Sequence, residues 1–196
     1  ACLGHYPEAG LKTYAEHMPE FPDSDFNTIK QPMDFVGLNI YQGGVVKAGA
    51  DGEPEHVPHA VGHPITCFDW PVTPAALRWG HYWAHKHFDL PVVITENGLA
   101  SMDWVGLDGR VRDGQRIDFT RQYLLELEKA IADGTEVDGY FHWSIMDNFE
   151  WGEGYTKRFG LIHVDYQTQV RTLKDSARWY RTIIESNGAK LAESPA

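Results

Sequence analysis

The sequence has few cysteines, no long apolar run and no excess of positive charge, and each shortage excludes a class of protein. Its 196 residues include two cysteines, Cys2 and Cys67, too few for a disulfide framework and not spaced as metal ligands. No apolar run approaches the roughly 20 residues of a membrane-spanning helix. Because Asp and Glu outnumber Lys and Arg by 28 to 17, the chain repels phosphate backbones and anionic lipids. We therefore expect no nucleic-acid partner and no membrane partner.

The composition predicts one folded domain. Hydrophobic residues make up 42% and aromatic residues 13% of the chain, which is enough for a sizeable core. The first residues lack the basic and apolar regions of a signal peptide, so we expect a cytoplasmic location. The first residue is Ala1 rather than Met, and we expect that an upstream segment has been removed or lies on another chain.

Three short apolar runs predict strands at 35–41, 91–95 and 137–144. Such continuous runs are typical of parallel strands covered on both faces. The polar, glycine-rich stretch 43–62 predicts a loop or hairpin, and the tail 189–196 is expected to fray. A parallel sheet of three βα units is the expected α/β architecture.

A helix is predicted after each strand. The first is expected to begin at Thr73 as N-cap with Pro74 in its first turn. The second is expected at about 115–133 with Gly134 as C-cap, and the third at about 174–187, ending at Gly188. The residues expected to face inward are Leu77, Ala84 and Phe88 in the first helix, Ile117, Leu124, Leu127 and Ile131 in the second, and Ala177, Tyr180, Ile183 and Ile184 in the third.

Three parallel strands cannot close into a barrel, so the sequence predicts part of a larger fold. We expect unpaired strand edges, and inward-facing side chains such as Val36, Ile94 and Phe141 without an opposing wall. An open doubly wound sheet is possible in principle. However, no glycine-rich phosphate loop follows any of the three strands, which argues against a nucleotide site.

Two segments carry residues suited to chemistry. Glu96 ends a strand in the run ITENG, where a parallel sheet presents side chains to a cleft; alternatively, it simply opens a turn. The segment 143–151 brings two indoles and two carboxylates together after the next strand. Indole faces stack on sugar rings and carboxylates accept sugar hydroxyls, so this segment suits a pyranose. The alternative is that Trp143 and Trp151 are core residues and that Glu150 caps a turn.

Together these motifs resemble the C-terminal part of family 1 glycoside hydrolases, the bacterial β-glucosidase group. The resemblance rests on ITENG, on FHWSIMDNFEW continuing through GYTKRFG to VDYQTQ, and upstream on DFVGLNIY and FDW. It implies that residues 1–188 form the last three βα units of a (β/α)₈ barrel, with 189–196 as a frayed tail. The implied activity is retaining hydrolysis of terminal β-D-glucosyl residues, with a β-glucoside or a cellobiose-like molecule as substrate.

The same resemblance implies roles for individual residues. Glu96 matches the catalytic nucleophile, Tyr41 a tyrosine that orients it, and Asn39 a neighbour of the reacting carboxyls. A strand-end tyrosine is also common in protein cores, and an asparagine in a strand can instead satisfy backbone groups.

Four further aromatic residues and one glutamate match the sugar site. Trp143 corresponds to the stacking floor, Glu150 to a bidentate hydroxyl ligand and Trp151 to an indole donor to a hydroxyl. Phe159 would close the pocket, and Trp70 would flank the aglycone; the alternative for Trp70 is a core role. Members of the family that act on 6-phosphorylated sugars lack the Glu–Trp pair, and a carboxylate there repels the phosphate.

The family's general acid, a Glu in an Asn-Glu-Pro segment, is missing from these residues. We expect a complementary N-terminal barrel segment as the partner that supplies it, because retaining hydrolysis needs two carboxyls about 5 Å apart. The alternative is a non-catalytic sugar-binding or self-associating barrel fragment. We expect no cofactor and no metal, because His81 and His85 fit a solvated helix face better than a metal site.

Overall fold

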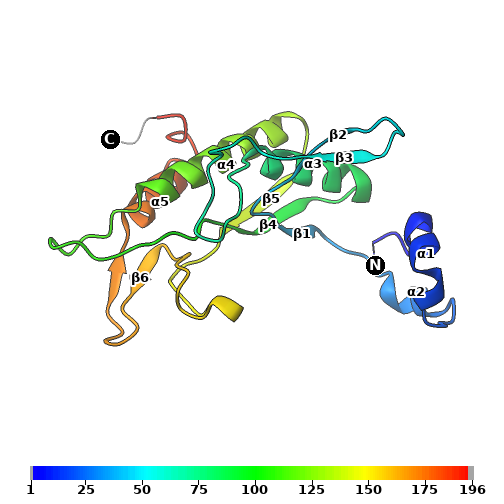
Figure 1. Cartoon of the computed structure of the whole chain (residues 1–196), viewed down its shortest axis with the longest axis horizontal. Coiled ribbons are helices and arrows are strands. Elements are labelled where there is room, and N and C mark those ends of the chain that lie inside the picture. The colour runs from blue at the N-terminus through cyan, green and yellow to red at the C-terminus, as the bar shows by residue number, and fades with distance from the viewer. Residues whose placement is uncertain (1, 194–196) are drawn as a thin grey trace.

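The computed structural model describes residues 2–193. Three parallel strands are each followed in the chain by a helix, and two hairpins and a helical N-terminal segment accompany them (Figure 1). The elements are α1 (Glu8–Tyr14), η1 (Ala15–His17), α2 (Asp25–Ile29), β1 (Val36–Asn39), β2 (Val45–Ala48), β3 (Pro54–Val57), α3 (Ala75–Phe88), β4 (Val92–Asn97), α4 (Gly114–Ala132), β5 (Val137–His142), η2 (Trp151–Glu153), β6 (Ile162–Val164), β7 (Arg171–Leu173) and α5 (Asp175–Glu185).

The sheet has the order β1-β4-β5, with both pairs parallel. The three expected βα units are therefore present. In register, Asn39 lies beside Glu96 and Asn97 lies beside His142. Parallel strands present their carboxyl ends at one edge of the sheet, and the expected site residues gather at that edge. Within residues 2–193, β1 and β5 each pair only with β4 in this sheet.

The helices cover one face of the sheet, and the core lies between the two layers (Figure 1). Ile94 is fully buried in this core beside Leu77, Phe119 and Tyr123. The expectation that Ile94 points toward a missing wall is therefore wrong, as it is for Val36, which pairs with the buried Val92 on the same face. Side chains alternate along a strand, so the residues one position away face the other side.

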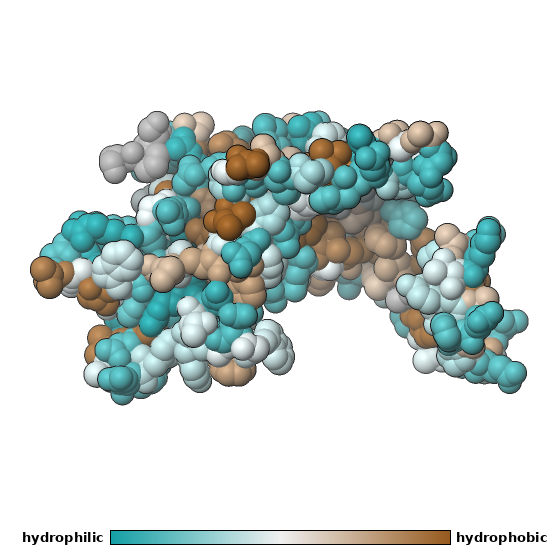
Figure 2. Space-filling model, viewed as in Figure 1, coloured by the Kyte–Doolittle hydropathy of each residue, from teal (hydrophilic) through white to brown (hydrophobic). Residues whose placement is uncertain are grey.

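No helix covers that other face within the described residues, although Val93 on it is 9% exposed. Phe141, which was expected to lack an opposing wall, is 61% exposed, and Phe35 is 48% exposed. Gly37, Asn39 and Thr95 are also exposed there. Figure 2 shows apolar surface in the hollow between the helix layer and the N-terminal segment. The sheet thus buries one face and leaves the other open.

The helix boundaries agree with the sequence prediction better than the helix faces do. Thr73 does not cap α3 with its side chain; its hydroxyl accepts a hydrogen bond from the Gly43 amide at 2.8 Å. Gly134 and Gly188 follow α4 and α5 with φ of +92° and +80°, the backbone conformation that favours glycine.

The buried stripe of α4 differs from the predicted one. Ile131 is 52% exposed, and the buried residues are Arg116, Phe119, Thr120, Tyr123, Leu127 and Ala130. Ile184 of α5 is likewise 63% exposed. Of the predicted residues in α4, Leu127 is buried and Leu124 packs against the core. The actual stripe also includes an arginine and a threonine, which hydrophobic periodicity does not select.

His81 is a further correction. It was expected on a solvated helix face, yet it is fully buried in α3, with Nδ1 2.7 Å from the carbonyl oxygen of Leu77. Burial lowers the pKa of His81 below its usual value. His81 is therefore a neutral core residue.

The remaining segments lie around this sheet. The expected hairpin within 43–62 is formed by β2 and β3, and β6 and β7 form a second hairpin. Tyr6, Phe21 and Phe26 pack edge to face in the N-terminal segment. In the expected tail, Arg121 of α4 donates to the carbonyl oxygens of Leu191 and Ala192, and 194–196 lie outside the described residues. Among the described helices, none is long and apolar enough to span a bilayer.

Candidate functional site

Glu96 and Tyr41 meet at the carboxyl ends of β4 and β1. The Tyr41 hydroxyl donates a 2.6 Å hydrogen bond to Glu96 Oε2. Burial raises the pKa of Tyr41 well above its usual value, and the hydrogen bond and negative charge of Glu96 raise it further, with a smaller contribution from Glu150. Tyr41 therefore keeps its proton and stays a donor to the carboxylate.

The backbone that carries this pair is held by buried polar groups. Asn97 is fully buried; its amide donates to the Ile40 carbonyl oxygen at 2.8 Å and accepts from the Tyr140 hydroxyl at 2.8 Å. The Tyr123 hydroxyl donates to the Tyr41 carbonyl oxygen at 2.9 Å. Asn97 is the last residue of β4, so Glu96 lies within the strand instead of opening a turn. The hydrogen bond from Asn97 to Ile40 holds Glu96 next to Tyr41.

Asn39 lies in register with Glu96, as the sequence led us to expect. Its side-chain oxygen accepts a 2.6 Å hydrogen bond from the Thr95 hydroxyl. Both residues are exposed on the uncovered face. Asn39 therefore faces open space beside the Tyr41–Glu96 pair and is oriented by Thr95, a partner that the sequence did not single out.

Glu150 lies close enough to Glu96 for their charges to interact. Burial raises the pKa of Glu150, a hydrogen bond from the Trp143 side chain opposes this, and the negative charges of Glu96 and Glu153 raise it further. Trp143 and Glu150 are both half-buried. Both Trp143 and Glu96 therefore influence the charge of Glu150.

Aromatic rings form one side of this site. Tyr41 lies 5.2 Å from Trp70 and 6.0 Å from Phe159, measured between ring centroids. Trp70 stacks on Phe68 at 4.5 Å, and Phe159 is buried. Trp151, in contrast, is 82% exposed. The structure thus brings Trp70 and Phe159 to Tyr41 and leaves Trp151 in solvent.

The segment that carries Trp143 is clamped between two glycines. The Trp143 amide donates to the Asn97 carbonyl oxygen at 2.9 Å, and the Leu161 amide donates to the Ser144 carbonyl oxygen at 2.9 Å. A Cβ on Gly98 would lie 1.9 Å from the Trp143 carbonyl oxygen, and one on Gly160 would lie 2.1 Å from the Asp147 amide nitrogen. Only glycine permits these two backbone approaches.

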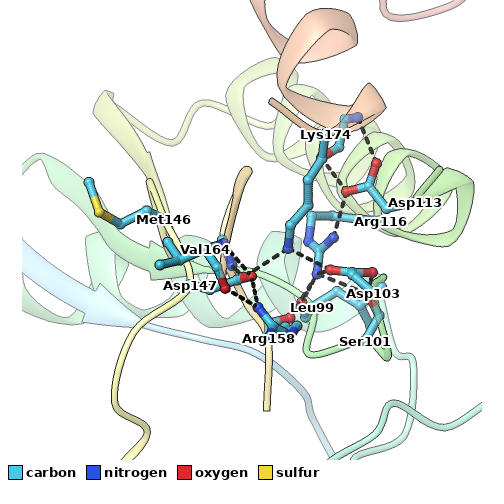
Figure 3. Close-up of polar contacts among 12 residues, drawn as sticks. Leu99, Ser101, Asp103, Asp113, Arg116, Met146, Asp147, Arg158, Val164 and Lys174 are labelled. Atoms are coloured by element: carbon cyan, nitrogen blue, oxygen red, sulfur yellow. Dashed lines mark hydrogen bonds and ion pairs between the residues drawn. The ribbon is translucent and has the colours of Figure 1, made fainter. Parts of the chain in front are cut away.

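Sequence reasoning missed a buried network of charges behind this segment (Figure 3). It joins residues that are far apart in the chain: Asp103, Asp113, Arg116, Asp147, Arg158 and Lys174. Asp147 was one of the two carboxylates noted in 143–151, but nothing in the local pattern indicated its partners. The only signal was a charged residue, Arg116, at a position that helical spacing places beside Phe119 and Thr120.

A cavity of about 530 Å³ lies between the loop 63–67 and α4, and its lining residues include none of the expected site residues. Among residues 2–193, no three His, Cys, Asp or Glu side chains come together as a metal-binding group.

Comparison with known proteins gives one consistent result. β-Glucosidase A of Thermotoga maritima is 42% identical over 186 residues, and 1,4-β-D-glucan glucohydrolase of Thermotoga neapolitana is 42% identical over 187. Each match covers 94% of this chain and 42% of the relative, so the chain spans less than half the length of these relatives.

The solved structures agree. A family 1 β-glucosidase from Thermotoga maritima superposes with a TM-score of 0.85 at 41% identity, covering 95% of this chain and 42% of that one. The family profile described as glycosyl hydrolase family 1 matches residues 1–189. The resemblance inferred from the motifs is thereby confirmed, and the chain belongs to glycosyl hydrolase family 1.

Proposed function

We propose that this chain is the last three βα units of a (β/α)₈ barrel in a retaining β-glucosidase. Two features of the sheet support this proposal: one face is uncovered, and β1 and β5 each pair with only one neighbour. In a closed barrel that face would be the interior and both strands would have two neighbours. The chain covers 42% of its relatives, which is consistent with a partial barrel. The complementary segment would then supply the other strands.

The hydrogen bond between Tyr41 and Glu96 carries the functional proposal. A nucleophilic carboxylate must be ionised and fixed in direction, and a protonated Tyr41 holds one of its oxygens at 2.6 Å. Glu96 would attack the anomeric carbon and form a glycosyl ester as the glycosidic bond breaks. Water would then hydrolyse the ester and return the free carboxylate.

The general acid would come from the complementary segment, in its Asn-Glu-Pro motif. It would protonate the leaving oxygen in the first step and take a proton from water in the second. Asn39, exposed beside Glu96, would lie between the two carboxyls. Glu150 is not a substitute for this acid, because we assign it to the sugar hydroxyls.

The glycone would be held by the segment after β5. Trp143 would stack on the ring and Glu150 would accept two hydroxyls; Trp151 would add an indole donor once the complementary segment covers it. Phe159 and Trp70 would bound the pocket beside Tyr41. The Thermotoga maritima enzyme has been solved with castanospermine and with deoxynojirimycin, which supports a sugar-sized site. The carboxylate of Glu150 favours unphosphorylated β-glucosides and cellobiose-like substrates.

The test is complementation. We define the completed enzyme as this chain joined to the portion of the Thermotoga maritima β-glucosidase A that it does not match. The chain alone should show no hydrolysis of an aryl β-glucoside, and the completed enzyme should turn it over. A 2-fluoro β-glucoside should label a peptide containing Glu96, as read by mass spectrometry.

Two results would contradict the proposal. One is ordinary turnover by the chain alone, which would require another acid within these residues. The other is labelling of a different carboxylate in the completed enzyme. If the chain instead forms stable dimers that bind glucose and the completed enzyme is inactive, the self-associating fragment becomes the better account.

A further inference from the structure

The buried charge network ties together the two loops on which the proposed reaction depends. One loop follows β4 and the nucleophile Glu96, and it contains Asp103. The other follows β5 and contains Asp147, which lies between Trp143 and Glu150 in sequence. All six charged side chains of the network are less than a fifth exposed, and five are at most 3% exposed.

Lys174, directly before α5, bridges these loops with one atom. Its Nζ lies 2.5 Å from Asp103 Oδ2 and 2.8 Å from Asp147 Oδ1. The Lys174 amide also donates to the Leu161 carbonyl oxygen at 3.0 Å. One ammonium group therefore fixes the separation of a carboxylate in each loop.

Arg116 of α4 makes a parallel connection. Its guanidinium donates to the Leu99 carbonyl oxygen at 3.3 Å and to Asp103 at 2.8 Å, both after the nucleophile strand. It also donates to the Arg158 carbonyl oxygen at 2.8 Å, next to Phe159 of the aromatic wall. The planar guanidinium suits such a multiple contact.

Asp147 is the point where the second loop is held. Its carboxylate accepts from Arg158 at 2.5 Å, Lys174 at 2.8 Å, the Gly160 amide at 3.0 Å and the Val164 amide at 3.3 Å. Figure 3 shows Asp147 between Arg158 and Lys174. Asp147 is 3% exposed and directs no atom at a sugar in the arrangement described.

The charges of the network balance. Three cations, Arg116, Arg158 and Lys174, face three anions, Asp103, Asp113 and Asp147. Burial raises the pKa of Asp103, but Arg116 and Lys174 outweigh it and hold that pKa below the usual value. Removing one member therefore leaves an uncompensated buried charge. A variant of the network can therefore lose activity because it loses stability or because the loops move, and the variants below distinguish these two causes.

We infer that Lys174 and Arg116 are positioning residues that set the distance between Glu96 and Glu150. Lys174 holds Asp103 and Asp147 together, and Arg116 holds Asp103 and the Leu99 carbonyl oxygen beside the Arg158 carbonyl oxygen. The inference rests on the proposed function, since it assigns Glu150 to the sugar. Neither cation touches substrate. Each acts through the loop it holds, and misplacing Glu150 weakens its bonds to the transition state more than it changes the intrinsic chemistry at Glu96.

The experiment uses the completed enzyme and four variants: Lys174→Met, Lys174→Met/Asp103→Asn, Glu150→Gln and Lys174→Met/Glu150→Gln. Lys174→Met should lower kcat/KM for an aryl β-glucoside about 100-fold. Lys174→Met/Asp103→Asn restores charge balance, so its Tm should return close to that of the unmutated enzyme while kcat/KM stays low. In the Glu150→Gln background, Lys174→Met should lower kcat/KM by less than about threefold, because the two residues act as a unit.

The matched control is Lys129→Met, which removes an exposed lysine of α4 paired with Glu126; its kcat/KM should match that of the unmutated enzyme. Recovery of kcat/KM together with Tm in Lys174→Met/Asp103→Asn would overturn the inference, since the effect would then be stability alone. Full additivity with Glu150→Gln would also overturn it. An inactive unmutated enzyme would contradict the proposed function instead.

Discussion

The two faces of the β1-β4-β5 sheet are made by the same strands and have opposite surroundings. Ile94 and Val92 point to the helices and are fully buried, whereas Phe141, one strand away, is 61% exposed on the other face. Apolar area removed from water contributes roughly 25 cal/mol per Å². Burial of the helix-covered face therefore stabilises this chain by itself. The uncovered face contributes to stability only when another part of the protein packs against it.

The largest expected effect separates chemistry from packing. In the completed enzyme, Glu96→Gln should lower kcat by several orders of magnitude, because the amide cannot form the glycosyl ester. Tm should change little, since neither face of the sheet is altered. Steady-state hydrolysis of an aryl β-glucoside measures kcat, and a thermal unfolding scan of the same variant measures Tm.

Tyr41→Phe is the companion variant. It keeps the ring against Trp70 and removes only the donor to Glu96, so its loss of kcat should be smaller than that of Glu96→Gln. Near-normal turnover by Glu96→Gln would rule out Glu96 as the nucleophile.

The second prediction compares the faces directly. Ile94→Ala should cost about 2–5 kcal/mol of unfolding free energy in this chain and in the completed enzyme, because its cavity opens in an existing core. Phe141→Ala should leave the unfolding free energy of the chain alone almost unchanged. In the completed enzyme it should cost about 3–5 kcal/mol, as a buried phenylalanine does.

Urea unfolding of both variants in both contexts measures this difference. Light scattering on the chain alone should also show less self-association for Phe141→Ala than for Ile94→Ala, since only the former removes exposed apolar surface. Equal costs for Phe141→Ala in the two contexts would mean that the uncovered face is not a barrel interior.

The smallest expected effect is on the stability of the protein at acidic pH. Both ring nitrogens of His142, at the end of β5, are buried and have no hydrogen-bond partner among the described residues. Burial and the cation of Arg116 lower its pKa to about 3. The unfolded chain binds this proton near pH 6.5, so the unfolded state holds more protons between these values and stability falls as pH falls. The limiting slope is about 1.4 kcal/mol per pH unit for one such group.

His142→Phe should therefore flatten the loss of stability of the completed enzyme between pH 6.5 and 4, as measured by urea unfolding. His87→Phe, at an exposed position of α3, is the control and should leave the slope unchanged. A slope unaltered by His142→Phe would mean that the buried imidazole is protonated in the folded protein. His81 lowers stability in the same direction, so the flattening is partial.

The sequence predicts well those features whose residues are neighbours in the chain, and poorly those that depend on contacts between distant residues. The apolar run at 91–95 and the following Glu96 lie in one short segment, so both the strand and its catalytic candidate could be found. The stripe of α4 could not, because Arg116 is buried through partners elsewhere in the chain and Thr120 is a polar residue that is buried without a hydrogen-bond partner for its hydroxyl among the described residues. Lys174 and Asp103 are 71 positions apart, and charged residues are ordinarily read as surface.

The roles taken from the family resemblance had a different outcome. Tyr41 hydrogen-bonds Glu96, as two motifs 55 positions apart implied. Trp151 is exposed, so its role depends on what covers the bare side. The residue roles themselves stay predictions until the variants are measured.

The glycine clamp at Gly98 and Gly160 has a consequence for directed evolution of this scaffold. A library of variants that randomises Gly98 or Gly160 would consist mostly of misfolded proteins. Any side chain at either position would collide with backbone atoms. Gly152, by contrast, has open space around its Cβ position, and Glu153 and Tyr155 are exposed. Gly154 has a φ of +60° and should stay glycine. Substitutions at 152, 153, 155 and 156 should alter substrate preference and leave the backbone that holds Trp143 unchanged.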